Sequence, residues 1–385
     1  MQRRLPFYRA LPAQLWQWLD GRYRLEELSH ALLEVPIPRS AATYFLGGIT
    51  LFLFGVQVIT GILLAVYYQP TPESAYASIL YIMNDVPFGW LIRSIHSWGA
   101  NLMIVFCVLH LLRVYLQSAY KAPREVTWMA GVLLLMVTLV FGFTGYLLPW
   151  DQRAYWATTV GTEIAGAVPW LGEYVMYFLR GGPDITSLTL SRFFATHVLI
   201  MPISLGGLLL LHLVMVHQQG LADPKTEIDP LEAPTASSEK PAPTAVPIAE
   251  TDSPDVAIES PKRKLMLPFF PDYVLDEVIA WYIVLGLLVV LASLLPAGLE
   301  ERADPFKTPP HVKPEWYFLA VYQALKLVPR TIGIMAPIVA VFVLLIFPFI
   351  DRNPGKAWRK RPIAVSLAFI VLLLMIVLSI WGWVS

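Results

Sequence analysis

The sequence predicts an all-α polytopic membrane protein, and its composition and the length of its apolar runs support this. Of the 385 residues, 56% are hydrophobic, whereas a soluble domain is usually about 45–50% apolar. Runs of about 20 apolar residues match a bilayer core of roughly 30 Å at 1.5 Å of helical rise per residue. Seven runs are expected to span the membrane, at 41–68, 92–116, 126–148, 193–217, 274–296, 331–350 and 363–384.

Basic residues are concentrated in one set of loops. The loops on the N-terminal side (1–40, 113–125, 218–271 and 351–362) hold 19 of the 28 lysines and arginines, although the formal net charge is zero. An excess of basic residues in short loops marks the cytoplasmic side. We therefore expect the N-terminus on the cytoplasmic side, here named the n-side, and the C-terminus on the opposite side, the p-side.

The chain divides into four segments. Residues 1–40 mix Trp, Leu and charged residues and predict an interfacial amphipathic helix on the n-side, without a cleavable signal peptide. Residues 41–220 hold four spans, and 265–385 hold three. The intervening 221–264 is rich in Pro, Ala, Ser and Thr, and such a composition predicts a disordered linker. The single Cys107 excludes both a disulfide within the chain and a CxxCH site for a covalent c-type haem.

Four histidines lie in the second and fourth expected spans. His110 follows His96 by fourteen positions, and His212 follows His197 by fifteen. At 100° per residue each pair returns to within about 40–60° of one helix face, roughly 21–22 Å apart along the axis. Both spans run from the p-side to the n-side, so His96 is expected to meet His197 and His110 to meet His212. Bis-histidine ligation of two stacked haems accounts for all four side chains.

Other interpretations of these histidines remain open at this point. A lone histidine within a membrane often hydrogen-bonds a neighbouring backbone or hydroxyl group. Two registered pairs on helices of the same direction are harder to explain in that way. A metal ion alone is disfavoured, because each level offers two histidines and no nearby cysteine or carboxylate.

Glycines and arginines repeat the histidine pattern. The first and third spans carry Gly47 with Gly61 and Gly131 with Gly145, and both intervals are again fourteen positions. A residue without a side chain lets a flat macrocycle approach the backbone, although small residues also serve ordinary helix packing. Three arginines lie just outside the histidines, where they suit haem propionates or plain interfacial anchoring: Arg93, Arg113 and Arg192.

Several stretches together resemble the motifs of one family. They are FLGGITL, FGWLIRSIHSW, LRVY, KAPREVTW, GFTGYLLPWDQRAYWA, ADPFKTPP and KPEWYF. By these motifs the chain resembles cytochrome b of the quinol-oxidising cytochrome bc complexes. The longer interval, between His197 and His212, and the end after three C-terminal spans resemble the photosynthetic branch, in which cytochrome b and subunit IV are separate polypeptides. The resemblance implies a four-helix haem-binding bundle fused through 222–262 to three C-terminal transmembrane helices.

The resemblance implies a p-side quinol site between PWDQRAYW and KPEWYF, made by Pro314, Glu315, Trp316 and Tyr317. Quinol oxidation releases two protons, so a proton acceptor must lie beside the ring, and Glu315 is the best candidate. Tyr146 and Tyr155 are expected to position the quinol or relay protons. The alternative for Glu315 is a surface carboxylate at the end of a short helix.

Two features of the n-side depart from the photosynthetic branch. Phe45 stands where that branch has a cysteine that fixes an extra haem, so no covalent haem is expected. His217 follows His212 by five positions and resembles a quinone-binding histidine of the respiratory branch. The alternative for His217 is a solvated histidine at a helix end. A fused chain without that cysteine points to a bacterial inner membrane.

The activity implied by the resemblance is that of a quinol:cytochrome c reductase, with electron transport coupled to proton translocation. Quinol gives one electron to a separate Rieske iron–sulfur subunit, and the second crosses the membrane through two non-covalent haem b groups to a quinone near His217. The expected partners are a cytochrome c type or plastocyanin-like acceptor, a second copy of the chain, and menaquinone, ubiquinone or plastoquinone. No nucleic-acid partner is expected.

Two other functions fit part of the sequence. A dihaem membrane anchor of a dehydrogenase would keep the haems but need neither the PEWY segment nor the three C-terminal spans. A secondary transporter with proton-relaying histidines would show no haem absorbance.

Overall fold

The computed structural model describes residues 13–33, 36–38, 45–222, 266–310 and 312–385. In these residues the expected all-α architecture is confirmed: helices dominate, and the strands are two short segments at the n-side. Residues 223–264 of the expected linker lie outside the described residues, as do 1–12, 34–35 and 39–40 of the expected interfacial segment.

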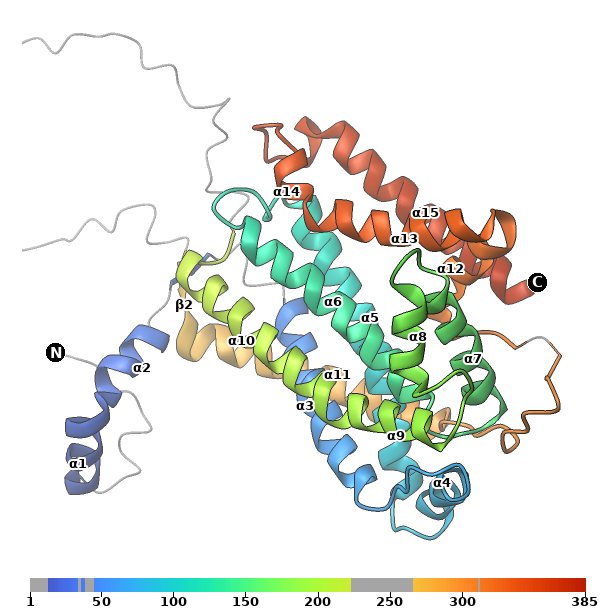
Figure 1. Ribbon diagram of the computed structural model, residues 1–385. Coiled ribbons are helices and arrows are strands. Elements are labelled where there is room, and N and C mark those ends of the chain that lie inside the picture. Colours follow the sequence, from blue (N-terminus) through green and yellow to red (C-terminus); the bar gives the residue numbers. More distant parts are fainter. Residues whose placement is uncertain (1–12, 34–35, 39–44, 223–265, 311) are drawn as a thin grey trace, which may run out of the picture.

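The N-terminal half is a bundle of four long helices joined by short ones at the p-side (Figure 1). The long helices are α3 (Leu46–Ala65), α5 (Gly89–Leu116), α6 (Glu125–Tyr146) and α10 (Met201–Gln219). The short p-side helices are α4 (Ala75–Asn84), α7 (Gln152–Gly166), α8 (Gly172–Arg180) and α9 (Ser187–Ala195). Helix α3 packs against α5, and α6 against α10, so each histidine-bearing helix lies beside a glycine-bearing one.

The C-terminal half packs against this bundle on two sides. It comprises α11 (Val274–Leu294), α12 (Trp316–Leu327), α13 (Arg330–Leu345), α14 (Phe347–Ile350) and α15 (Pro362–Val384). Helix α11 contacts α5 and α3, α13 contacts α6, and α12 packs mainly on α15. The carbonyl of Trp383 accepts a hydrogen bond from Lys313, so the C-terminus lies beside the loop that precedes α12.

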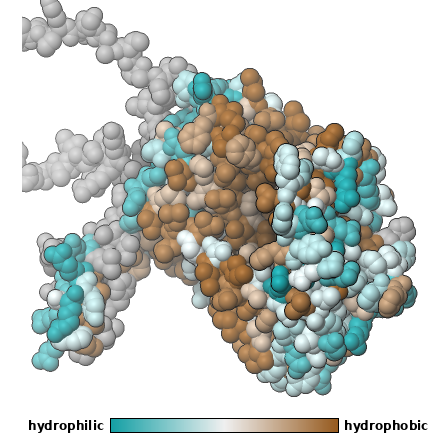
Figure 2. Space-filling model, in the orientation of Figure 1, coloured by the Kyte–Doolittle hydropathy of each residue, from teal (hydrophilic) through white to brown (hydrophobic). Residues whose placement is uncertain are grey.

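Within the described residues, six helical segments are long and apolar enough to cross a bilayer: 46–65, 89–116, 125–146, 187–219, 269–294 and 362–384. The seventh expected span, 331–350, differs, because it is divided into the 16-residue α13 and the 4-residue α14. Pro348 has no N–H to continue the ladder and its ring opposes the preceding turn, which accounts for the break near Ile346. Apolar side chains of the spanning helices give the broad hydrophobic surface in Figure 2, bordered by hydrophilic residues at the end that carries α7 and α8.

The expected amphipathic helix near the N-terminus is two helices. Helix α1 (Ala13–Tyr23) ends at Arg24, whose φ of 49° stops the helical path, and α2 (Leu25–Leu33) begins beyond it. Leu15, Trp18 and Tyr23 are exposed. After α2, the strand β1 (Pro36–Pro38) pairs with β2 (Met266–Pro268) in antiparallel register, and this joins the two halves at the n-side.

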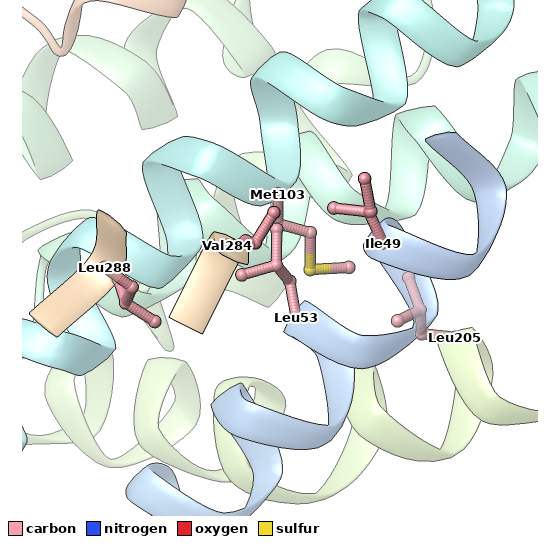
Figure 3. Close-up of a cluster of buried hydrophobic side chains, with 6 residues drawn as sticks. All are labelled: Ile49, Leu53, Met103, Leu205, Val284 and Leu288. Carbon is pink, nitrogen blue, oxygen red and sulfur yellow. The ribbon is translucent and has the colours of Figure 1, made fainter. Parts of the chain in front are cut away.

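A cluster of six buried side chains fills the centre of the bundle (Figure 3). Its members are Ile49, Leu53, Met103, Leu205, Val284 and Leu288. Met103 lies midway between His96 and His110 in the sequence, and Leu205 lies between His197 and His212. The cluster is therefore an apolar layer between the two levels of histidines, made by α3, α5, α10 and α11.

Buried charges join the two halves at the n-side. Arg361 is 1% exposed, and its Nε lies 3.3 Å from Oδ2 of Asp351. Lys121 and Tyr120, from the loop between α5 and α6, contact the same carboxylate. Burial by itself raises the pKa of Asp351, but the hydrogen bond from Tyr120 and the charges of Lys121 and Arg361 outweigh it and hold that pKa below its ordinary value. We name these four residues the n-side clamp.

Removing Arg361 is expected to destabilise the protein, because it leaves the Asp351 carboxylate buried beside a single cation. Breaking a buried ion pair from one side costs about 3–5 kcal/mol, so Arg361→Ala should lower the unfolding temperature, measured by tryptophan fluorescence of the purified protein. Arg359→Ala is the matched control, since Arg359 is exposed in the same segment. Because the pKa of Asp351 is lowered in the folded protein, its ionised carboxylate contributes to the stability of the fold at pH values above its unfolded-state pKa. This contribution is lost as the pH falls through the pKa of Asp351 in the folded state. Equal unfolding temperatures for the two variants would contradict the clamp.

Candidate functional site

The four histidines meet as two pairs at two depths of the bundle. The rings of His96 and His197 are 6.3 Å apart between centroids, with an interplanar angle of 75°. Two imidazoles on opposite sides of one metal atom have centres roughly 6 Å apart, since each metal–nitrogen bond is about 2 Å and each ring centre about 1 Å beyond its nitrogen. His110 lies close enough to His212 for their charges to interact. The pairing is the one that the spacing predicts.

A π-helical turn explains how His197 and His212, fifteen residues apart, can pair with His96 and His110, which are fourteen residues apart. His197 lies in the π-helical segment Thr196–Ile200, where the N–H of Met201 donates to the carbonyl of Thr196, five positions earlier. A π-turn holds one more residue than an α-helical turn, and such turns are frequent at functional sites. The extra residue between His197 and His212 is absorbed here, so both rings face α5. The extra residue in the interval between His197 and His212 is the sequence signal of this turn, although helical periodicity does not locate it.

Each histidine ring lies against one of the four predicted glycines. A Cβ atom placed on Gly61 would lie 3.2 Å from Cε1 of His96, and one on Gly47 would lie 3.3 Å from Cε1 of His110. The same atom on Gly131 would lie 3.4 Å from Cε1 of His212. On Gly145 it would overlap Cε1 of His197, closer than real Cβ atoms come. The glycines of α3 and α6 therefore make room for the imidazoles themselves.

Hydrogen bonds at the p-side pair fix the ring orientation. Nδ1 of His96 lies 2.8 Å from the Thr60 hydroxyl. Nδ1 of His197 lies 3.2 Å from both the Thr144 hydroxyl and the carbonyl of Phe141. A ligating histidine commonly uses its second nitrogen in this way. At the n-side, Nδ1 of His110 is buried and has no hydrogen-bond partner among the described residues.

These features fit haem better than a metal ion held by protein ligands alone. In the part of the chain that the structure describes, no group of three or more His, Cys, Asp or Glu side chains could hold a metal ion. Haem brings four equatorial nitrogens of its own and needs only two axial side chains. The histidine pairs, the neighbouring glycines and the apolar surroundings supply what it requires.

The predicted arginines have protein partners in the structure. Arg93 donates to the carbonyls of Ala297 and Gly298, at 2.6 and 2.8 Å, and thereby holds the segment that follows α11. Arg192 donates to the carbonyl of Phe178. Arg113 donates to Gln117 at 3.1 Å and lies within electrostatic range of His110. Of the three, Arg113 is the one that the structure associates with a histidine.

Around Glu315 the structure brings several predicted residues together. Glu315 is the N-cap residue of α12, and its side chain makes no capping hydrogen bond. It is partly buried, and its Oε1 lies 3.3 Å from Nη1 of Arg153. Tyr146 and Tyr317 both lie within electrostatic range of this carboxylate. Burial, followed by the charge of Glu315, raises the pKa of Tyr317, so its phenol stays protonated and can donate. Trp316 is fixed by a hydrogen bond of 2.6 Å from its indole N–H to Asn101.

Backbone pairing between two distant loops builds this site. The segment after α6 and the segment after α11 form an antiparallel bridge at Asp151 and Arg302. The N–H of Gln152 donates to the carbonyl of Glu301, and that of Ala303 donates to the carbonyl of Trp150. These bonds hold the PWDQRAYW segment beside the polypeptide that leads to Glu315.

Two predicted residues lie apart from this group. Tyr155 packs edge-to-face on Trp150 and Trp156, and its charged neighbours are Arg180 and Asp184 rather than Glu315. His217 is exposed in the last turn of α10. Sequence reasoning missed Arg153 as a member of the site, although it is the basic residue of the PWDQRAYW motif and could have been suspected as a partner of Glu315 from its charge.

Comparisons with known proteins agree with this arrangement. A family profile described as "Cytochrome b/b6/petB" matches residues 33–220, and one described as "Cytochrome b(C-terminal)/b6/petD" matches residues 302–385. A "Cytochrome bc complex cytochrome b subunit" of Chlorobaculum thiosulfatiphilum is 35% identical over 368 residues, which cover 94% of this chain and 78% of the relative. "Cytochrome b6" of Heliobacterium mobile is 45% identical over 210 residues, 54% of this chain and 99% of the relative.

A solved structure extends the similarity across both halves. The chain superimposes on a component of a "Hyperthermophilic respiratory Complex III" with a TM-score of 0.78 and 31% identity, covering 95% of this chain and 90% of that one. The N-terminal profile, the C-terminal profile and the full-length relative thus describe one fused polypeptide. The chain belongs to the cytochrome b family, as the haem-binding cytochrome b subunit of a bc-type quinol oxidoreductase complex, with a b6-type N-terminal half fused to a subunit IV-like C-terminal half.

Proposed function

We propose that the chain holds two b-type haems without covalent attachment, one between His96 and His197 and the other between His110 and His212. The observation that carries this proposal is that all four histidines pair across the bundle and each lies against its own glycine. When bound, the haems supply one-electron carriers at two depths of the membrane. Nδ1 of His96 contacts Thr60, and Nδ1 of His197 contacts Thr144 and the carbonyl of Phe141. The other ring nitrogen of each histidine, Nε2, would therefore be the one to bind the iron.

At the p-side, Glu315 accepts a proton from quinol. Tyr317 remains protonated and can donate a hydrogen bond to the quinol oxygen, while Asn101 holds the Trp316 ring in place. Tyr146 lies within electrostatic range of Glu315, and Pro314 directly precedes Glu315 in the chain. One electron leaves for a separate Rieske iron–sulfur subunit. The other enters the membrane at the level of His96 and His197.

At the n-side, a quinone near His217 receives electrons and takes up protons. His217 is exposed beyond His212 on the same helix, within reach of the aqueous phase. Phe45 packs against Tyr273, with ring centroids 5.8 Å apart, and offers no thiol for an additional covalent haem. Proton release at one face and uptake at the other make the reaction a proton translocation.

The membrane, the orientation of the chain and its partners are proposed on the same basis. The N-terminus lies on the cytoplasmic side of a bacterial inner membrane and the C-terminus on the opposite side, as the basic loops indicate. The chain works as a homodimer with a Rieske protein and a cytochrome c type or plastocyanin-like acceptor. Its quinone is a menaquinone, ubiquinone or plastoquinone.

Replacing one ligand is expected to remove one haem and leave the other. His96→Ala or His212→Ala should lower haem from two to one per chain, measured by the pyridine-haemochrome spectrum of the purified protein. His217→Ala is the matched control on the same helix as His212 and should retain both. Two haems in either ligand variant would contradict the assignment, and no haem in the parent protein would favour the transporter.

Adding a single methyl group at Gly145 is expected to disturb the p-side pair. The new Cβ of Gly145→Ala would overlap Cε1 of His197, so the ring must move. We expect a shift of the p-side reduction potential or loss of one haem, measured by redox titration of the absorbance. Gly207→Ala in the same bundle is the control, because nothing lies within 4 Å of its Cβ position. Identical titrations for the two variants would be inconsistent with the close contact.

Glu315→Gln is expected to slow quinol oxidation at the p-side about 100-fold, as removal of a general base does, with haem content unchanged. The rate is followed as haem reduction by decylubiquinol in a stopped-flow spectrometer. Glu301→Gln, an exposed carboxylate of the preceding loop, should keep the parent rate. A parent-like rate in Glu315→Gln would instead favour the dehydrogenase anchor.

A further inference from the structure

Arg153 lies between two carboxylates, of which the proposed function uses one. Its Nη1 is 3.3 Å from Oε1 of Glu315, and its Nε is 3.4 Å from Oε1 of Glu300. Side-chain exposure rises along this series, from 24% at Glu315 through 39% at Arg153 to 47% at Glu300. The three side chains form a continuous charged path from the partly buried site to the p-side surface. We name it the p-side charge path.

Glu300 is held in place by the backbone. Its N–H donates to Oδ2 of Asp151, at 3.2 Å, and its carbonyl accepts from the Tyr76 hydroxyl, at 2.9 Å. Because Asp151 also caps α7, which contains Arg153, the position of Glu300 relative to the guanidinium is fixed by the same loop pairing that builds the site. The contact is therefore a property of the fold and not of one long side chain reaching into solvent.

We propose that Arg153 is a positioning residue that pairs with the Glu315 carboxylate and holds it turned toward the p-side, and that Glu300 is the next proton acceptor on the way to solvent. This inference rests on the proposed function, in which Glu315 takes the proton of quinol. It adds the route by which that proton leaves the site, through Glu300, and the residue that pairs again with the Glu315 carboxylate afterwards, Arg153.

The sequence of charges follows from the three side chains. With both carboxylates ionised, the path carries a net charge of one negative unit around one guanidinium. When an O–H bond of quinol breaks and its proton forms an O–H bond on Glu315, the remaining Arg153–Glu300 pair is neutral. Arg153 stays protonated throughout, since a guanidinium is not deprotonated in proteins. Solvent water then carries the proton from Glu315 to Glu300, which releases it to the bulk phase, and the restored Glu315 carboxylate pairs with Arg153 again.

Other ionisable groups face this path from each neighbouring element. Asp151 and Arg93 come from the N-terminal half, and they interact electrostatically with each other. Tyr146 lies at the end of α6, and Tyr317 lies in α12. Burial raises the pKa of Tyr317, so this phenol does not change charge at neutral pH. Arg93 is engaged by two backbone carbonyls, which leaves Arg153 as the cation in contact with Glu315.

The test compares Arg153→Gln with Arg153→Lys in the purified complex, with decylubiquinol as donor and haem reduction as readout across pH. A cation in contact with a carboxylate stabilises the ionised form, so loss of the cation favours the protonated form. In Arg153→Gln the acidic limb of the rate profile should therefore move about one unit toward higher pH. Arg153→Lys keeps the charge and should keep the parent profile. A profile of Arg153→Gln that coincides with the parent overturns the role of Arg153.

An infrared spectrum of the resting protein gives a second readout, independent of turnover. Arg153→Gln should show a protonated carboxyl band at a pH where the parent shows none, and the band should vanish in Arg153→Gln/Glu315→Gln. A merely structural role of Arg153 would alter the rate without producing this band. Absence of the band in Arg153→Gln therefore counts against the proposal.

Glu300→Gln tests the exit step, with Glu301→Gln as matched control. Glu301 is the next residue along the chain and pairs with Lys307 at the open surface. Proton release, followed with a pH dye outside vesicles that contain the complex, should fall about tenfold in Glu300→Gln, within the range for loss of a proton-transfer group, and stay within twofold in Glu301→Gln. Parent-like release in Glu300→Gln overturns the exit route. If Glu315→Gln oxidises quinol at the parent rate, the proposed function has failed. If Glu315→Gln loses activity while the Arg153 and Glu300 variants behave like the parent protein, this inference alone is refuted.

Discussion

Four imidazole rings must fit between closely packed helices, and the whole N-terminal half is arranged to make room for them. Each ring lies against a glycine of the neighbouring helix, and at Gly145 even a methyl group would collide with His197. The contact requires α3 to pack on α5 and α6 on α10. The glycine interval of fourteen equals the histidine interval in α5 and is one residue shorter than the interval between His197 and His212. Helix order, glycine positions and histidine spacing are thus three expressions of one steric constraint.

The same constraint explains the irregular part of α10. In a straight α-helix His212 would be rotated away from the face that His197 occupies, because fifteen positions overshoot four helical turns whereas fourteen fall slightly short of them. The π-turn at Thr196–Ile200 takes up that extra residue. Between the two levels, Met103, Leu205 and the rest of the central cluster form an apolar layer (Figure 3).

The p-side site depends on a different principle, which is the pairing of loops from both halves. Glu315 and Arg153 are far apart in the sequence, yet the bridge at Asp151 and Arg302 brings their segments together. At the opposite face the n-side clamp joins the halves a second time through Arg361 and Asp351. Since this bridge, the n-side clamp and the β1–β2 pairing all hold the halves together, the covalent connection between them does not by itself place Glu315 at its site.

The membrane class, the helices that carry the histidines and the pairing of those histidines could all be predicted from the sequence alone, because periodicity and apolar length act within single helices. The glycine register was predictable in the same way, whereas the importance of the PWDQRAYW and KPEWYF segments was predicted from their resemblance to the motifs of a known family. The π-turn, the division of the seventh span at Ile346, and the partners of Arg93, Arg192 and Tyr155 emerged only from the packed structure. The Arg153–Glu315 contact is the clearest case. Which charged side chains form a pair depends on their distance in the packed structure, and helical periodicity in the sequence does not predict that distance.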